Sequence, residues 1–137
     1  MTGRALVDTG ALLALANPRD QYHAKAVALG RRFLRSGGRW LGTTLVLGEL
    51  HGHLLYRRGA TVARTVTASL LEDPAYEWLE VSPSLIHDAL TEWLARFADQ
   101  KFSLTDAVSF TVMRQVGLST AFAFDKDFVT AGFDLLR

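Results

Sequence analysis

A short apolar strand runs into a carboxylate near the start of the chain, in Ala5-Leu6-Val7-Asp8-Thr9-Gly10-Ala11. The three residues before Asp8 are apolar and typical of a strand buried in a sheet. Apolar residues resume at once, so we expect a helix over residues 11–16. A strand followed directly by a helix is the beginning of an α/β unit, and it leaves Asp8 at the carboxyl end of the strand.

The same alternation of strand and helix continues along the chain. Short apolar runs predict further strands at residues 40–43, 77–81, 121–124 and, as an edge strand, 133–136. Amphipathic stretches predict helices at residues 21–35, 61–71, 84–98 and 105–116, and another that begins at Thr43 or Thr44 and ends at Gly59. In the helix 21–35 the expected inward residues are Ala24, Val27, Ala28, Phe33 and Leu34. This order predicts an α/β fold with a mainly parallel sheet.

Length and composition predict one folded domain that spans residues 1–137. A chain of 137 residues, 49% hydrophobic with eight Phe and three Trp, can bury a core and is too apolar for wholesale disorder. It has no cysteine, which excludes disulfides, Fe–S clusters and cysteine zinc sites and fits a reducing cytoplasm. Asp8 interrupts the apolar run that imitates a secretory signal, and no run approaches the ~20 residues of a membrane span. We therefore expect a cytoplasmic protein without a membrane segment.

The charges of the chain are segregated along the sequence. The formal net charge is only +1, but residues 21–71 contain eight basic residues and a single acid, Glu49. The rest of the chain contains seven basic and thirteen acidic residues. This asymmetry indicates either a polyanion-binding face beside an acidic site or an ordinary solvated surface.

Four acids are expected to meet at one edge of the sheet. Asp8 and Asp125 each follow a predicted strand, Glu49 lies early in the helix after the second strand, and Asp106 opens the helix 105–116. In an open parallel sheet the binding crevice lies beyond the carboxyl ends of the strands. We therefore take Asp8, Glu49, Asp106 and Asp125 as the candidate catalytic and metal-binding residues.

Each acid also has a purely structural interpretation. Asp8 can open a turn, and Glu49 can be a helix-surface charge. Ser103-Leu104-Thr105-Asp106 has the pattern of a capping box, in which Asp106 stabilises the start of its helix. In Phe124-Asp125-Lys126-Asp127-Phe128, one aspartate can bind metal while the other caps; Asp125 ranks first because it is nearer the strand, and Asp127 is an auxiliary ligand.

Clustered carboxylates indicate a hard divalent cation. Like charges repel, so such a site needs a compensating cation or raised pKa values. Carboxylate oxygens suit Mg²⁺ or Mn²⁺ better than soft metals. A metal held in this way activates water and stabilises charge on a phosphoryl oxygen, which points to phosphodiester hydrolysis.

Four segments in this order resemble a PIN domain. They are Leu6-Val7-Asp8-Thr9-Gly10-Ala11-Leu12-Leu13, Thr43-Thr44-Leu45-Val46-Leu47-Gly48-Glu49-Leu50, Phe102-Ser103-Leu104-Thr105-Asp106-Ala107 and Phe124-Asp125-Lys126-Asp127-Phe128. Asp20-Gln21-Tyr22-His23-Ala24-Lys25-Ala26 is similar to the start of that family's second helix. One position differs, because many relatives carry Thr or Ser where this chain has Ala123; Thr9, Ser103 or Thr105 can supply the missing hydroxyl.

The resemblance implies a three-layer α/β/α fold and a Mg²⁺- or Mn²⁺-dependent ribonuclease whose acids are Asp8, Glu49, Asp106 and Asp125, with Asp127 auxiliary. A compact domain of this kind is similar to the VapC-type toxins of bacterial toxin–antitoxin pairs. Such toxins are typically homodimers that cleave RNA and are held inactive by a small cognate antitoxin.

Two other functions stay open at this stage. A PIN-like module that binds RNA or protein without cutting is favoured by Ala123, and a phosphohydrolase acting on small esters uses the same acids. Arg57 and Arg58, at the end of the Glu49 helix, are candidate RNA contacts, with helix C-terminal charges as the structural interpretation. His53 stands one turn after Glu49 and is expected to be a plain polar histidine on the helix surface.

Overall fold

The strand that precedes Asp8 lies at the centre of the sheet. The computed structural model describes residues 3–137, and within them five parallel strands pair in the order β3-β2-β1-β4-β5. The strands are β1 (Arg4–Val7), β2 (Arg39–Thr43), β3 (Tyr76–Leu79), β4 (Thr120–Phe122) and β5 (Asp134–Leu135). The two strands that flank β1 come from far along the chain, so its carboxyl end is placed beside segments remote in sequence.

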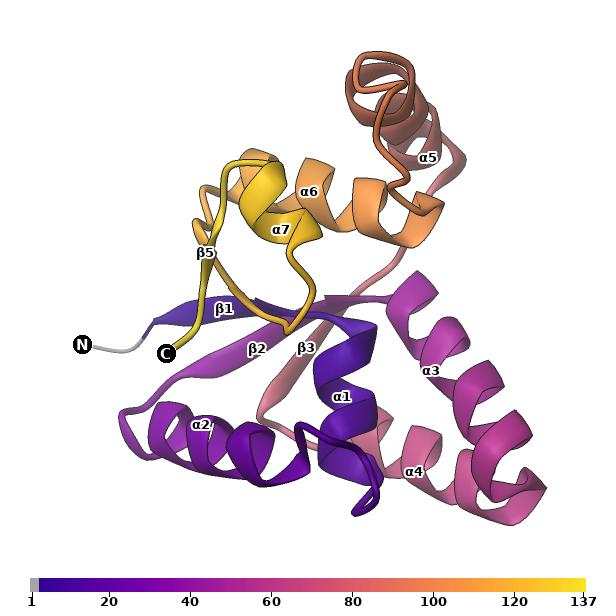
Figure 1. Ribbon diagram of the computed structural model, residues 1–137, viewed down its shortest axis with the longest axis vertical. Coiled ribbons are helices and arrows are strands. Elements are labelled where there is room, and N and C mark those ends of the chain that lie inside the picture. Colours follow the sequence, from indigo (N-terminus) through magenta and orange to yellow (C-terminus); the bar gives the residue numbers. More distant parts are fainter. Residues whose placement is uncertain (1–2) are drawn as a thin grey trace.

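Helices cover both faces of this sheet, as Figure 1 shows. They are α1 (Thr9–Ala16), α2 (His23–Arg35), α3 (Thr44–Arg58), α4 (Ala60–Glu72), α5 (Pro83–Ala89), the π-helix η1 (Leu90–Ala95), α6 (Leu104–Val116) and α7 (Asp127–Thr130). One core lies between the sheet and the helices α5, η1, α6 and α7, and a second lies between the sheet and α1 to α4. The three-layer α/β/α architecture is therefore confirmed.

The central strand contributes side chains to both cores. Leu6 packs into the first, whereas Ala5 and Val7 pack into the second, and all three are fully buried. A strand covered on both faces has no solvent side, which is why its sequence is continuously apolar instead of alternating.

The predicted caps form where the sequence places them. The Thr43 hydroxyl accepts a hydrogen bond from the Val46 amide (3.3 Å) and begins α3. Gly59, with φ 90°, ends α3 and leads into α4, and Gly117, with φ 74°, ends α6 in the left-handed region. Both values suit glycine, which lacks the Cβ that disfavours positive φ.

The prediction for the inward face of α2 was wrong at three of its five residues; Val27 and Phe33 are half-buried. Ala24, Ala28 and Leu34 are exposed, and Ala26, Leu29 and Gly30 are buried instead. Gly30 faces Leu15, Trp40 and Phe122, so the helix approaches the sheet where it has no side chain. Phe33 does lie inward and stacks on Trp40, with ring centroids 4.3 Å apart.

Several predicted boundaries also shift. The helix expected over residues 84–98 is α5 followed by the π-helix η1, which carries the fully buried Trp93. The expected strands 77–81 and 121–124 end earlier, at Leu79 and Phe122, and the edge strand is only two residues long. The short helix α7 was not predicted. Within residues 3–137, no helix is both long enough and apolar enough to span a membrane.

Candidate active site

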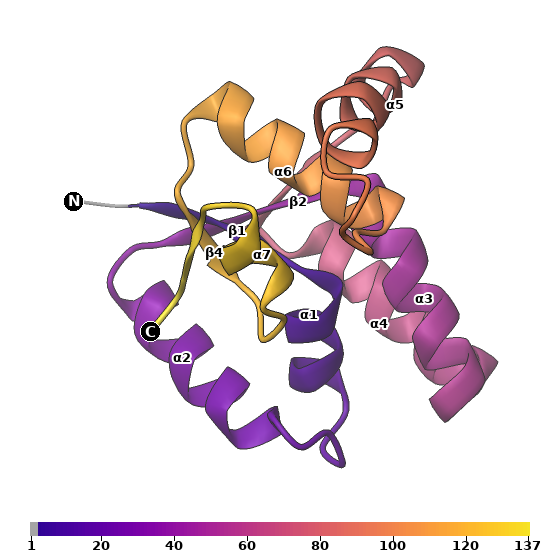
Figure 2. The same ribbon diagram turned by 45° about the horizontal axis from the view of Figure 1, so that its top comes forward.

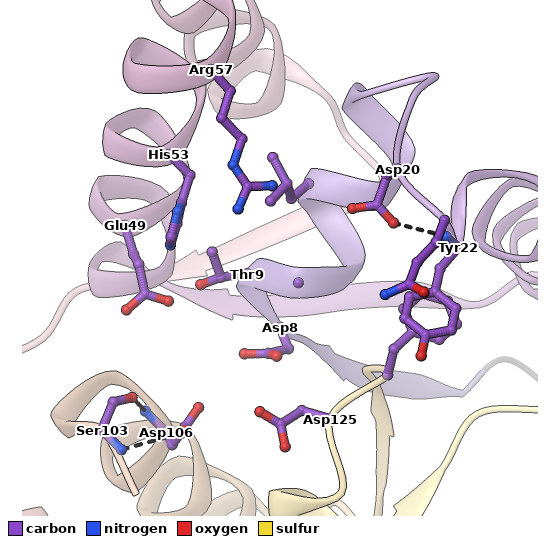
Figure 3. Close-up of a pocket in the computed structure, with 14 residues that line it drawn as sticks. Asp8, Thr9, Asp20, Tyr22, Glu49, His53, Arg57, Ser103, Asp106 and Asp125 are labelled. Carbon is purple, nitrogen blue, oxygen red and sulfur yellow. Dashed lines mark hydrogen bonds between the residues drawn. The ribbon is translucent and has the colours of Figure 1, made fainter.

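An open pocket of about 590 Å³ lies at the carboxyl edge of the sheet. Its lining includes all four acids predicted from the sequence, and they come from four different segments of the chain. Figure 3 shows their carboxylates facing a common space, together with Thr9, His53 and Arg57. The parallel sheet therefore brings together acids that are up to 117 residues apart in sequence, Asp8 and Asp125.

Asp8 lies deepest in the pocket, with 6% of its surface exposed. Its backbone amide donates to the Phe122 carbonyl (3.0 Å), which ties the residue to the neighbouring strand β4. It occupies the N-cap position of α1, yet its side chain makes no capping hydrogen bond there. Burial, followed by the charges of Asp106, Glu49 and Asp125, raises the pKa of Asp8 to about 7.

Asp106 has the structural role that its sequence pattern predicts, and it also lines the pocket. Its Oδ2 accepts the Ser103 amide (3.3 Å) while its own amide donates to the Ser103 hydroxyl (3.0 Å), which completes the capping box of α6. Burial is the main cause that raises the pKa of Asp106 to about 6; the Ser103 hydrogen bonds oppose the shift and the charges of Asp125 and Asp127 add to it. The cap and the pocket are thus served by one carboxylate.

Asp125 lines the pocket, whereas Asp127 does not. Asp125 lies three residues beyond the end of β4; its Oδ1 accepts the Asp127 amide (2.8 Å), and the residue lines the pocket as well. Asp127 opens α7 and is not among the pocket-lining residues. Partial burial, and then Asp125, raise the pKa of Asp127 above its ordinary value.

One face of α3 forms a wall of the pocket. Glu49, His53 and Arg57 are spaced four residues apart, and Figure 3 shows all three projecting from this helix toward the same space. His53 is exposed on the helix surface, as expected, and it also lines the pocket one turn after Glu49.

The two candidate arginines differ in their contact with the acidic pocket. Arg57 lines the acidic pocket and also a smaller pocket that it shares with Pro18, Arg19 and Arg58. Arg58 lines the smaller pocket and not the acidic one, and it donates to Asn17 Oδ1 (3.4 Å). Neighbouring side chains on a helix point about 100° apart, which agrees with Arg57 alone of the pair reaching the acidic pocket.

Among the described residues, the acids of the pocket have no basic partner at ion-pair distance. Among residues 3–137 the ion pairs are Arg4–Glu77 (3.1 Å) and His87–Asp88 (4.0 Å), and both lie elsewhere. The donors that remain are carboxylate oxygens, a set that fits Mg²⁺ or Mn²⁺. In the described part of the chain, no three acidic or histidine side chains are close enough together to hold a metal ion.

The fold and the acidic pocket together identify the protein family. The family model of the PIN domain matches residues 5–134, and the chain belongs to the PIN domain family. Over 131 residues it is 35% identical to the 23S rRNA-specific endonuclease VapC20 of two strains of Mycobacterium tuberculosis, an alignment that covers 96% of each chain. The crystal structure of Mycobacterium tuberculosis VapC20, described as a sarcin-ricin loop cleaving toxin, superposes with a TM-score of 0.82 over 94% of this chain and 95% of that one.

Two more distant structures share the fold. VapBC2 from Rickettsia felis, bound to a DNA fragment from its promoter, matches with a TM-score of 0.66 at 14% identity, covering 98% of this chain and 97% of that one. FitAcB from Neisseria gonorrhoeae matches with a TM-score of 0.65 at 14% identity, covering 100% and 97%. At this identity the likeness shows the fold alone.

The raised pKa values predict how stability depends on pH. Between about pH 4 and pH 7 the unfolded chain has released the protons of Asp8 and Asp106, whereas the folded protein still binds them. The free energy of unfolding contributed by these two groups therefore falls as pH rises through this window. Urea denaturation in EDTA from pH 4.5 to pH 7.5 measures it, with the double variant Asp8→Asn/Asp106→Asn as reference.

We expect the wild type to lose stability relative to this variant as pH rises, because an amide does not titrate. Saturating Mg²⁺ reverses the loss in the wild type, since the cation binds the ionised carboxylates. A difference between the two proteins that stays constant across the window, in EDTA, contradicts the prediction.

Proposed function

We propose that this chain is a metal-dependent endoribonuclease in which Asp8, Glu49, Asp106 and Asp125 bind Mg²⁺ or Mn²⁺. The observation that carries the proposal is that these four carboxylates, from four segments, line one pocket together with a fifth acid, Asp20, with no basic group at ion-pair distance among residues 3–137. The relative named as an endonuclease supports it, because the two chains align over nearly their whole lengths. Asp127 remains an auxiliary ligand in this proposal, since it lies outside the pocket lining.

The other pocket residues suit the binding of a phosphodiester. A divalent cation bound here supplies charge stabilisation for a phosphoryl oxygen and lowers the pKa of bound water. Arg57 and His53 stand on the α3 wall, where they can donate hydrogen bonds to phosphate oxygens. A lining carboxylate that does not bind the cation can accept a proton from the attacking water.

The hydroxyl that Ala123 cannot provide has a substitute in the pocket. Ala123 is buried and lines a neighbouring cleft instead of the acidic pocket. Thr9 lines the pocket, and its buried Oγ1 has no hydrogen-bond partner among the described residues. Ser103 already accepts the Asp106 amide, and Thr105 is not a lining residue. Thr9 is therefore the hydroxyl that we assign to orient water or substrate.

We further propose a biological setting like that of VapC-type toxins. The chain acts in the cytoplasm on a structured RNA, with 23S rRNA as the first substrate to test because the 35%-identical relative is specific for it. It works as a homodimer, and a small cognate antitoxin holds it inactive.

RNA cleavage tests the nuclease. In Mg²⁺ or Mn²⁺ we expect the wild type to cut 23S rRNA, or a fragment carrying the sarcin-ricin loop, and EDTA to abolish cutting. Asp8→Asn and Asp106→Asn should each lower the rate by about 10²-fold or more, because each removes a charged ligand or proton acceptor. Asp99→Asn, an exposed aspartate outside the pocket, is the matched control and should keep the wild-type rate.

The outcome separates the two main functions. Metal-dependent cutting that is lost in both pocket variants and kept in the control supports the endonuclease. RNA binding without cutting by the wild type in either metal contradicts it and favours the non-cleaving module.

The Thr9 hydroxyl gives a prediction in which stability and activity change in different ways. Thr9→Val keeps the shape of the side chain and removes a buried hydroxyl that has no partner among residues 3–137, so the free energy of unfolding should stay the same or rise by up to about 1 kcal/mol. The cleavage rate should fall by about tenfold or more, while Thr9→Ser keeps it. A Thr9→Val protein that is destabilised and cuts at the wild-type rate contradicts the assignment.

The toxin–antitoxin setting is tested with the reading frame immediately upstream in the source genome. We expect its product to form a complex with this chain and to stop RNA cutting at a stoichiometric ratio. Light scattering on the purified chain should give the mass of a dimer. An upstream product that neither binds nor inhibits, or a monomer at working concentrations, removes that part of the proposal.

A further inference from the structure

A second cleft lies beside the acidic pocket, between α2 and the C-terminal segment of residues 133–137. It has a volume of about 760 Å³, and we call it the α2 cleft. Figure 2 shows the C-terminal end of the chain reaching α2. Residues of α2 and of the segment 133–137 line the cleft. Tyr22 and Phe124 line both the α2 cleft and the acidic pocket, so the two cavities are neighbours that share an aromatic border.

This border is a pair of stacked rings. The centroids of Tyr22 and Phe124 are 4.7 Å apart and their planes differ by 5°. Tyr22 is 39% exposed, so part of the pair is open to a ligand. Stacking of unpaired bases on aromatic side chains is a common way in which proteins bind single-stranded nucleic acid, and it tolerates any base because every base has a π-face.

The α2 cleft carries the opposite charge to the pocket. Lys25 and Arg32 line it from α2, seven residues apart and therefore on one face of the helix, and Arg137 lines it from the other side. Asp134 is the acid in its lining, and no basic lining residue forms an ion pair within the described residues. The Lys25 ammonium also lies 5.8 Å from the centroid of the Phe124 ring, which places a cation next to the aromatic border.

The acidic pocket, the aromatic border and the basic cleft lie next to one another, so a single RNA strand can contact all three. At the acidic pocket a phosphate can be held only with a cation, because the lining carboxylates repel it. Beyond the aromatic border, lysine and arginine can contact the next phosphates directly. The apolar floor of the cleft, which includes Leu29 and Phe133, offers a surface for a base or a sugar.

We propose that the α2 cleft binds the single-stranded RNA adjoining the cleaved bond, with one base stacked on Tyr22 and its phosphates on Lys25, Arg32 and Arg137. This inference rests on the proposed endoribonuclease function. It adds the path of the substrate: the strand crosses from the acidic pocket over the Tyr22–Phe124 pair into a groove that the four acids do not touch.

Salt-dependent binding tests the charged part of the cleft. The probe is a fluorescent single-stranded RNA octamer, and binding is measured by anisotropy in EDTA, where no cutting takes place. Lys25→Gln/Arg32→Gln should weaken binding and reduce the slope of log Kd against log salt by about 1.4, or about 0.7 for each lost phosphate contact. Arg31→Gln/Arg35→Gln removes the same charge from the same helix at exposed positions outside the cleft, and it should leave most of the slope in place.

Two substitutions at Tyr22 test the aromatic part. Tyr22→Ala should weaken binding by roughly fivefold or more, and Tyr22→Phe should keep it, because the ring and not the hydroxyl stacks on a base. In the cleavage assay with metal, the Lys25→Gln/Arg32→Gln protein should show a raised KM with little change in kcat, since it loses binding away from the reacting phosphate.

The outcomes separate this inference from the proposed function. A wild type that cuts RNA, together with cleft variants that match the Arg31→Gln/Arg35→Gln control in slope and KM, overturns the cleft inference and leaves the nuclease. Cleft variants that keep RNA affinity but change the mass measured by light scattering also overturn it, and they identify the cleft as a contact between copies of the chain. A slope and a KM that change only in the cleft variants support it.

Discussion

The burial of the Asp8 carboxylate is the constraint on which the rest of this structure depends. A carboxylate so deeply enclosed, with four other acids lining the same pocket, is costly to ionise, as its raised pKa reflects. The fold nevertheless holds it there, because Asp8 ends the central strand and its amide is bonded to β4. A metal-binding function gives a reason for such an arrangement, since a bound cation relieves the repulsion that the apo protein retains.

Much of the fold could be predicted from the sequence, because strands, helices and caps depend on residues that are close together in the chain. The apolar run before Asp8 predicts a buried strand, and the Ser103–Asp106 spacing predicts a cap that the structure contains. The buried face of α2 could not be predicted from the sequence, because the helix meets Trp40 and Phe122 at a glycine, Gly30, instead of at a large apolar residue. The π-helix around Trp93 was not predicted, because the sequence of a π-helical turn has no feature that distinguishes it from an α-helix.

The candidate site, like the fold, could be predicted only in part from the sequence. That the four predicted acids line one pocket agrees with the parallel sheet that the alternation of strand and helix predicts. Which of two adjacent arginines faces the pocket depends on the rotation of α3 about its axis, and Arg57 and Arg58 cannot be told apart without it. Tyr22 and Phe124 both stand in segments that resemble the PIN domain, but their stacking was not predictable, because it joins the loop before α2 to the segment after β4.

The double duty of Asp106 bears on how a protein of this kind can lose its activity in evolution. Its Oδ2 accepts the Ser103 amide, and an asparagine at this position has a side-chain oxygen able to accept the same bond. One base change converts an aspartate codon to an asparagine codon, so a chain with an intact helix cap and a disabled pocket lies a single mutation away. Inactive descendants of such a protein can therefore persist as folded domains, free to be reused as binding partners.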